Sequence, residues 1–202
     1  RVAVSGLLGQ PSRGDDAAMM LRTLTAMAKV DGRVCAFLEP IALYMTKDLY
    51  EAGDALWSTP YPAPDQALEF GAERVYHEDA KDLLIVTFGN GVPFALRTAK
   101  AVEAQTGKKT RVIDLRWLQP LNAKAIAKHA GDCERILVLD EGRRSAGIGE
   151  GVITAIVEGG HGAKPLVRVV GDDTYTPLAG AANLILPTDA TVLEAALKLV
   201  SA

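Results

Sequence analysis

Short, wholly apolar runs that alternate with amphipathic segments of helical period constrain the fold of this chain more than any other feature. From Asp82 onwards the alternation is regular, and a run such as Leu83–Val86 has no polar residue to turn towards solvent. Strands of this kind are covered on both faces, as in a parallel sheet. Helical segments between them have the length of βαβ crossover connections. The sequence therefore predicts a three-layer α/β fold with a mostly parallel sheet.

The period of the apolar residues also sets the extent of each expected element. Hydrophobic residues make up 49% of the chain and charged residues 23%, which is the balance of a globular protein that can bury a sizeable core. We predict strands at residues 2–4, 34–38, 73–76, 83–88, 110–114, 136–139 and 166–170, and helices at residues 16–30, 92–105, 123–130, 147–157 and 191–200.

A proline-rich stretch separates the first elements from the regular part of the chain. Three prolines stand between residues 60 and 64, and a structureless loop as long as residues 39–81 is unusual inside one compact domain. We therefore predict two parts: residues 1–62, the remnant of one α/β domain, and residues 63–202, a complete second domain. The first residue is Arg1 rather than Met, and the chain reads as a piece of a longer one.

Charge and composition argue against several classes of function. The net charge of −3 disfavours non-specific nucleic-acid binding, and no uncharged apolar run is long enough to span a bilayer. The three histidines, His77, His129 and His161, have no metal-site spacing with a cysteine, and we expect each to be solvated. Cys35 and Cys133 lie among apolar residues, as buried thiols of a reducing cytosol would. We therefore expect a cytoplasmic protein without a disulfide.

Two loops that follow expected strands carry glycines or charges. The turn Gly89–Gly91 precedes a helix, where backbone N–H groups can bind an anion. Its glycines also suit a close-packed strand–helix turn, and we favour that interpretation over nucleotide binding. Asp140 and Glu141 begin a loop that continues to Gly149, and paired carboxylates can perform acid–base chemistry. A loop whose arginines neutralise the two acids is the simpler alternative.

Asp114 and Arg116 place an acid and a base at the end of an expected strand, with one residue between them. We favour a structural ion pair or a subunit contact over catalysis. No serine stands in the G-x-S-x-G setting of a hydrolase. The residues alone therefore predict an α/β domain with glycine-bearing loops and assign no catalytic residue.

Several segments, in a fixed order along the chain, resemble one enzyme family. Phe37–Tyr44, with the sequence FLEPIALY, resembles the F-x-E-P-x-x-L-Y segment of the beta subunits of branched-chain and pyruvate dehydrogenases. Val112–Leu121 and Arg168–Pro177 are similar to a V-I-D-L-R-x-x-x-P-x segment and an R-V-x-G-x-D-T-x-x-P segment of the transketolase C-terminal domain. The stretch Ile136–Gly149 and the pair Leu186-Pro187 also match, so the resemblance covers nearly the whole chain.

The resemblance implies part of the beta subunit of a thiamine-diphosphate-dependent 2-oxoacid dehydrogenase of the pyruvate or branched-chain type. In that family a pyrimidine-binding domain precedes the transketolase C-terminal domain, and thiamine diphosphate with Mg²⁺ lies between subunits. Residues 1–62 would be the end of the pyrimidine-binding domain. The family's essential glutamate, which is not Glu39, and its substrate-contacting histidine lie upstream of the segment present here. We therefore expect this chain alone to hold no catalytic or cofactor-binding residue and to be inactive.

The resemblance also implies a metal site. In branched-chain relatives the turn before the F-x-E-P segment helps to bind a structural potassium ion, and Ala28, Asp31 and Arg33 occupy the corresponding positions. Oxygen ligands, largely backbone carbonyls, suit such a hard cation. The alternative, which we favour, is a helix C-terminus closed by Gly32.

Assembly surfaces are a further implication of the resemblance. In the family, the C-terminal domain packs a dimer, with a second copy or a companion subunit, and docks the small binding domain of the lipoyl acyltransferase core. Complementary charge would guide such contacts. We expect these charged residues to take part: Asp114, Arg116, Asp140, Glu141, Asp172 and Asp173.

Three other functions stay open. A transketolase or deoxyxylulose-phosphate synthase parent would share the C-terminal domain, although the FLEPIALY segment favours the dehydrogenases. A non-catalytic assembly module would hold a dimer or recruit a partner without turnover. A free nucleotide-binding domain would use the turn Gly89–Gly91.

Overall fold

The chain forms two compact units that interleave along the sequence. The computed structural model describes residues 6–201. The first unit contains the described residues up to Arg74, together with Phe88–Asn90 and Leu115–Asn122. The second unit contains Val75–Thr87, Gly91–Asp114 and the chain from Ala123 onwards. The chain thus leaves the first unit and returns to it twice before it ends in the second.

The second unit is built on a five-stranded sheet. The strands, in their order across the sheet, are β3 (Arg74–Tyr76), β5 (Thr110–Asp114), β4 (Leu83–Thr87), β7 (Arg135–Arg143) and β8 (Leu166–Gly171). β4 pairs in parallel with β5 and β7, and β7 pairs in parallel with β8. Every residue of β4 and β5 is buried, including the polar residues of β5, because inner strands of a parallel sheet are covered on both faces.

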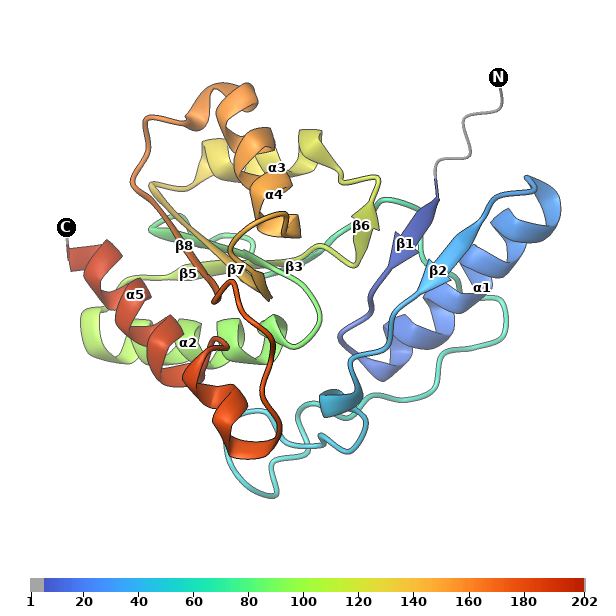
Figure 1. The fold of residues 1–202 in the computed structure, drawn as a ribbon, viewed down its shortest axis with the longest axis horizontal. Helices are drawn as coiled ribbons and strands as arrows, with labels where there is room; N and C mark the ends of the chain where they lie inside the picture. The colour runs from blue at the N-terminus through green and yellow to red at the C-terminus, as the bar shows by residue number, and fades with distance from the viewer. Residues whose placement is uncertain (1–5, 202) are drawn as a thin grey trace. The chain divides into compact units, whose positions relative to one another are not determined.

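Helices cover both faces of this sheet. α2 (Gly91–Thr106) packs against α5 (Asp189–Ser201), and α3 (Ala123–Asp132) packs against α4 (Ile148–Ile156). In Figure 1 the pair α2 and α5 lies on one side of the sheet and the pair α3 and α4 on the other. The expected three-layer α/β arrangement is confirmed. A π-helical turn, Val157–His161, continues α4, and a 3-10 helix at Ala179–Leu184 precedes α5.

The first unit has a smaller sheet and one long helix. Its strands, in order across the sheet, are β2 (Cys35–Phe37), β1 (Leu7–Gly9) and β6 (Trp117–Gln119), and α1 spans Gly14–Val30. β1 runs parallel to β2 and antiparallel to β6. The core consists of Leu7, Met20, Leu24 and Trp117, and Phe70 meets the Trp117 ring edge-on at a centroid distance of 5.0 Å.

The sequence pattern identifies only part of this first unit. The strand that we expect at residues 2–4 lies outside the described residues. β1 and β6 escape the pattern because each has only three residues, too few to show a period. The domain boundary between residues 62 and 63 stays a prediction.

Side chains, rather than a regular ladder, hold the irregular stretch between β2 and β3, where the only short helix is η1 (Ile41–Leu43). The Asp54 carboxylate accepts hydrogen bonds of 2.7–3.0 Å from the backbone N–H groups of Leu49, Tyr50, Glu51 and Leu56. Desolvation is the largest single influence and raises the pKa of Asp54, but the four donors together outweigh it and hold that pKa well below its ordinary value.

His129 is buried, so the expectation that it is solvated is wrong. It lies beside Arg111 of β5, whose guanidinium Nη1 is 2.9 Å from Nδ1 of His129 and 3.0 Å from a carboxylate oxygen of Asp132. Because a guanidinium group offers only donors, the His129 nitrogen must accept this hydrogen bond. A buried arginine needs such acceptors, and this requirement brings the histidine inside.

The two cysteines are free thiols, as expected for a protein without a disulfide. Cys133 is buried, and its burial raises the pKa of the thiol. Cys35 is only half-buried, with its sulfur 3.5 Å from the carbonyl oxygen of Leu24. Among the helices of residues 6–201, none combines the length and the apolar character that a membrane crossing requires.

Candidate functional site

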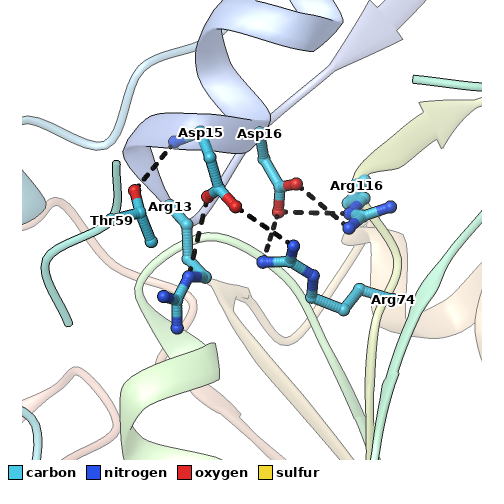
Figure 2. A network of polar contacts seen from close by, with 6 residues as sticks. All are labelled: Arg13, Asp15, Asp16, Thr59, Arg74 and Arg116. Carbon is cyan, nitrogen blue, oxygen red and sulfur yellow. Dashed lines mark hydrogen bonds and ion pairs between the residues drawn. The ribbon is translucent and has the colours of Figure 1, made fainter. Parts of the chain in front are cut away.

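A buried ion network surrounds the first turn of α1 (Figure 2). The Asp16 side chain is fully buried. Arg116 forms a bidentate ion pair with it, Nε to Oδ2 at 3.2 Å and Nη2 to Oδ1 at 3.0 Å. Arg74 adds a third contact from its Nη1, at 3.3 Å. Burial raises the pKa of Asp16, and the ion pairs with Arg116 and Arg74 offset part of that rise.

Asp15 extends the network towards the surface. Its carboxylate lies 3.2 Å from Nη2 of Arg74 and 3.6 Å from Nε of Arg13, and its backbone N–H donates to the Thr59 hydroxyl at 3.1 Å. Burial alone would raise the pKa of Asp15, but Arg74, the backbone of Asp16 and Arg13 together outweigh burial and lower it. The network joins residues from four separate segments of the chain, as Figure 2 shows. Its chemistry is structural, because the two carboxylates are engaged by Arg13, Arg74 and Arg116.

A surface pocket of about 220 Å³ lies next to this network in the first unit. One wall is the turn that leads into α1, and the other is the F-x-E-P-x-x-L-Y segment. Its lining residues are Pro11, Ser12, Arg13, Gly14, Ala17, Glu39, Pro40, Leu43 and Tyr44. The Tyr44 hydroxyl donates to Oε2 of Glu39 at 2.8 Å, and this hydrogen bond raises the pKa of Tyr44. The pocket therefore offers one acid, one phenol and one guanidinium group to a small ligand.

Asp140 has a structural role at the carboxyl end of β7. Its side chain is 2% exposed, and its carboxylate accepts hydrogen bonds of 2.7 Å from the N–H groups of Gly142 and Gly149. Gly149 lies in the first turn of α4, where the helix dipole favours a negative charge. Backbone N–H groups satisfy this carboxylate with hydrogen bonds, in place of the arginines that we expected. A cradle of glycines makes this approach possible, since a Cβ at Gly147 would lie 2.7 Å from the carboxylate.

The other expected interface residues differ in exposure. Asp172 and Asp173 are exposed, and Asp173 accepts hydrogen bonds from the backbone N–H and hydroxyl of Ser145 at 2.9 and 2.6 Å. These two bonds lower the pKa of Asp173. Glu141 is half-buried, and Asp114 is fully buried within the second unit. An interface role for these residues stays a prediction, and their exposure favours the pair Asp172 and Asp173.

Arg116 illustrates what the sequence could and could not reveal. Arg116 forms an ion pair with Asp16, which lies 100 positions earlier, whereas the sequence suggested Asp114 as its partner. Neither Asp16 nor Arg74 stood out in the sequence. The one available signal is the pair of adjacent acids in the first turn of the helix. That signal is weak, because the helix dipole alone makes acidic residues common there.

The residues expected to bind potassium do not fit a cation. Ala28, Asp31 and Arg33 are exposed, and Nε of Arg33 lies 4.0 Å from the carboxylate of Asp31. This guanidinium places a positive charge beside the only acidic ligand. Gly32 adopts the left-handed conformation with φ of 65°, and the N–H groups of Asp31 and Arg33 both reach the carbonyl of Met27. The alternative of a helix C-terminus closed by glycine is confirmed.

The glycine turn after β4 has a packing explanation. Gly89 has a φ of 53°, and a Cβ on it would lie 2.6 Å from the Gln10 side chain. A Cβ on Gly91 would collide with the hydroxyl of Thr87. Both positions therefore require glycine whether or not a ligand binds. Among the described residues, no group of three or more His, Cys, Asp and Glu side chains could hold a metal ion.

Comparisons with known proteins agree with this fold. The chain matches the family described as "Transketolase, C-terminal domain" over residues 72–192. The pyruvate dehydrogenase E1 component subunit beta of Staphylococcus aureus (strain Mu50 / ATCC 700699) is 30% identical over 137 residues, which cover 67% of this chain and 42% of the relative. The corresponding subunit of Rhizobium meliloti (strain 1021) is 27% identical over 153 residues, covering 73% of this chain and 33% of the relative. The chain thus spans less than half the length of these relatives.

A solved structure shows the same fold across both units. The protein titled "Split gene transketolase, inactive beta4 tetramer" superposes with a TM-score of 0.68 at 22% sequence identity, covering 98% of this chain and 59% of that chain. At this identity the likeness establishes the fold alone. The family match covers more than half of the chain, and it agrees with the motifs at Val112–Leu121 and Arg168–Pro177. This chain therefore belongs to the transketolase C-terminal domain family and is a relative of the beta subunits of thiamine-diphosphate-dependent 2-oxoacid dehydrogenases.

Proposed function

We propose that this chain is part of the beta subunit of a thiamine-diphosphate-dependent 2-oxoacid dehydrogenase, which decarboxylates a 2-oxoacid and passes the acyl group to a lipoyl group. The observation that carries the proposal is the 30% identity to a pyruvate dehydrogenase E1 beta subunit over 67% of the chain. The FLEPIALY segment supports the same assignment, because it resembles the F-x-E-P-x-x-L-Y segment of those beta subunits. Thiamine diphosphate would supply the carbanion chemistry.

The part of the enzyme present here would serve assembly rather than chemistry. Its buried acids, Asp16 and Asp140, are occupied by arginines and backbone N–H groups, so neither is available as a general base. No described residue is assigned to the diphosphate or to Mg²⁺. Dimer formation, with a second copy or a companion subunit, is the first role that we propose for the second unit.

Docking of the acyltransferase core is the second role. Asp172 and Asp173 are exposed on the segment that follows β8, and the Ser145 hydrogen bonds fix the Asp173 carboxylate in place and keep it ionised. A fixed pair of acids can steer a basic partner and set its orientation. The small subunit-binding domain of a lipoyl acyltransferase is the basic partner that we propose.

A charge-reversal experiment tests the docking role. The double variant Asp172→Lys and Asp173→Lys should weaken binding of that subunit-binding domain by about tenfold or more in low salt, measured by calorimetry. A matched variant, Asp79→Lys with Glu103→Lys, reverses two exposed acids elsewhere in the second unit and should leave the affinity within about twofold. Equal affinities for the wild-type chain and the Asp172 and Asp173 variant would count against this surface.

Calorimetry also separates the main proposal from a nucleotide-binding domain. The Gly89–Gly91 turn opens α2, whose N-terminus could receive a phosphate. Titration with ATP, NAD and FAD should produce no saturable heat if the turn serves packing alone. Saturable binding of any of these would favour the nucleotide-binding alternative. A stable dimer that neither binds the acyltransferase domain nor supports turnover would favour the assembly module.

A further inference from the structure

The segment Leu115–Asn122 belongs to the first unit although it lies far along the chain. It supplies strand β6, which pairs with β1 through Leu8 and Gly9. It also supplies Trp117, whose ring is fully buried against Met20 and Leu24 of α1. Without this segment the small sheet would lose an outer strand and the core its largest side chain.

Arg116 supplies the same unit with a counter-ion. The Asp16 carboxylate is fully buried, and Arg116 makes two contacts with it while Arg74 makes one. A buried carboxylate that loses its main partner is strongly unfavourable, because the charge has left water without compensation. The backbone of Arg116 is also unusual, with a φ of 56°, and its carbonyl accepts a hydrogen bond of 2.8 Å from the N–H of Gln10. Contacts on both sides of the residue hold this left-handed conformation in place.

The two arginines that contact Asp16 stand where the chain changes unit. Arg74 is the last residue of the first unit before Val75 opens the second. Arg116 follows Leu115, the first residue after the chain returns from Asp114. Asp16 therefore binds the chain at one point of departure and at one point of return. A change at this single carboxylate would remove a contact at both points, although Arg74 would keep its ion pair with Asp15.

We propose that Asp16, Arg74 and Arg116 form a conformational clasp, which keeps Leu115–Asn122 in the first unit and whose opening loosens that unit locally. The small sheet and α1 then depend on Leu115–Asn122, which lie far later in the sequence, whereas the five-stranded sheet has its own core. Such a clasp would let events at the start of α1 reach the connection between β5 and α3. Local opening of this kind is measurable as hydrogen exchange.

Hydrogen exchange on the full chain tests the clasp. The variant Arg116→Met should speed amide exchange in α1, β1 and β6 by about tenfold or more, and leave β4 and β7 unchanged. Arg97→Met is the matched control, because Arg97 pairs with Asp189 at 2.7 Å within the second unit. It should leave the exchange of α1, β1 and β6 unchanged. Equal acceleration of both units by Arg116→Met, or no acceleration in either, would overturn the proposal.

Two further variants separate the clasp from a general packing defect. The double variant Asp16→Asn with Arg116→Met removes both charges, and it should exchange more slowly in α1 than Arg116→Met alone. If Arg116→Met does not fold, Arg116→Lys takes its place, since it keeps the charge and loses the two-pronged contact. Exchange in α1 should then be faster than in the wild-type chain. A wild-type rate in Arg116→Lys would contradict the clasp.

Discussion

Removal of the Asp140 carboxylate should destabilise the second unit more than any change at an exposed acid. The carboxylate is 2% exposed and receives two backbone N–H groups at 2.7 Å. Asp140→Ala leaves both donors without this acceptor, and it also removes the negative charge from the first turn of α4. Water can reach Gly142, which is exposed, but not the buried Gly149.

The magnitude follows from these contacts. A hydrogen bond to a charged group contributes about 1.5–3 kcal/mol, and an unsatisfied buried donor costs about 1–3 kcal/mol. Because water can replace the acceptor at Gly142, we expect Asp140→Ala to lower the free energy of unfolding by about 2–4 kcal/mol. The stability of Asp140→Asn should lie between those of the wild-type chain and Asp140→Ala. Its side-chain carbonyl oxygen can accept from one N–H, while its amide NH2 group faces the other.

Urea unfolding followed by circular dichroism measures these changes. Asp172→Ala is the control, because Asp172 is exposed on the neighbouring segment, and it should change the free energy of unfolding by less than about 0.5 kcal/mol. If Asp140→Ala is as stable as Asp172→Ala, the carboxylate does not hold the start of α4, and the structural role argued for it is wrong.

Three further changes test other parts of the fold. The lowered pKa of Asp54 stabilises the folded chain at pH values above 3.8, the ordinary pKa of an aspartate, and this contribution is lost as the pH falls below 3.8. Asp54→Asn should therefore reduce the dependence of the free energy of unfolding on pH in the acid range, measured by urea unfolding. An unchanged dependence in that range would refute this. Lys164 donates to three carbonyl oxygens at the end of α3, at 2.6–2.7 Å. Lys164→Met should lower the free energy of unfolding by about 1–2 kcal/mol, and no loss would show that water replaces the ammonium group. Gly89→Ala should cost about 1–2 kcal/mol in the same assay, because φ is 53° there, and a neutral result would mean that the turn relaxes.

The second unit follows from its sequence because local signals agree with one another. The expected strands at Leu83–Thr87 and Thr110–Asp114 are buried strands, and the helical segments that follow the strands cover the sheet. Each such run is long enough to show its period. Gly32 likewise closes α1 as one of our two interpretations predicted. These features depend on residues that are neighbours in sequence.

The first unit resists the same reasoning because its key contacts are distant in sequence. The Asp16–Arg116 pair joins residues 100 positions apart, and neither residue shows its partner in a single sequence. β6 has three residues, so its pairing with β1 has no period to reveal it. Asp140 stood out in the sequence, but its hydrogen-bond partners did not, because they are backbone N–H groups, which every residue except proline carries.

The proposed parentage can be tested directly by reconstitution. The chain would be combined with polypeptides that supply the remaining length of the relatives, together with thiamine diphosphate, Mg²⁺ and a lipoyl domain. Mass spectrometry of the lipoyl domain then measures acyl transfer from pyruvate and from branched-chain 2-oxoacids. We predict an acylated lipoyl domain with at least one of these substrates, and no acylation when this chain is omitted. Ketol transfer between sugar phosphates by the same assembly, with no acylation of the lipoyl domain, would contradict the assignment.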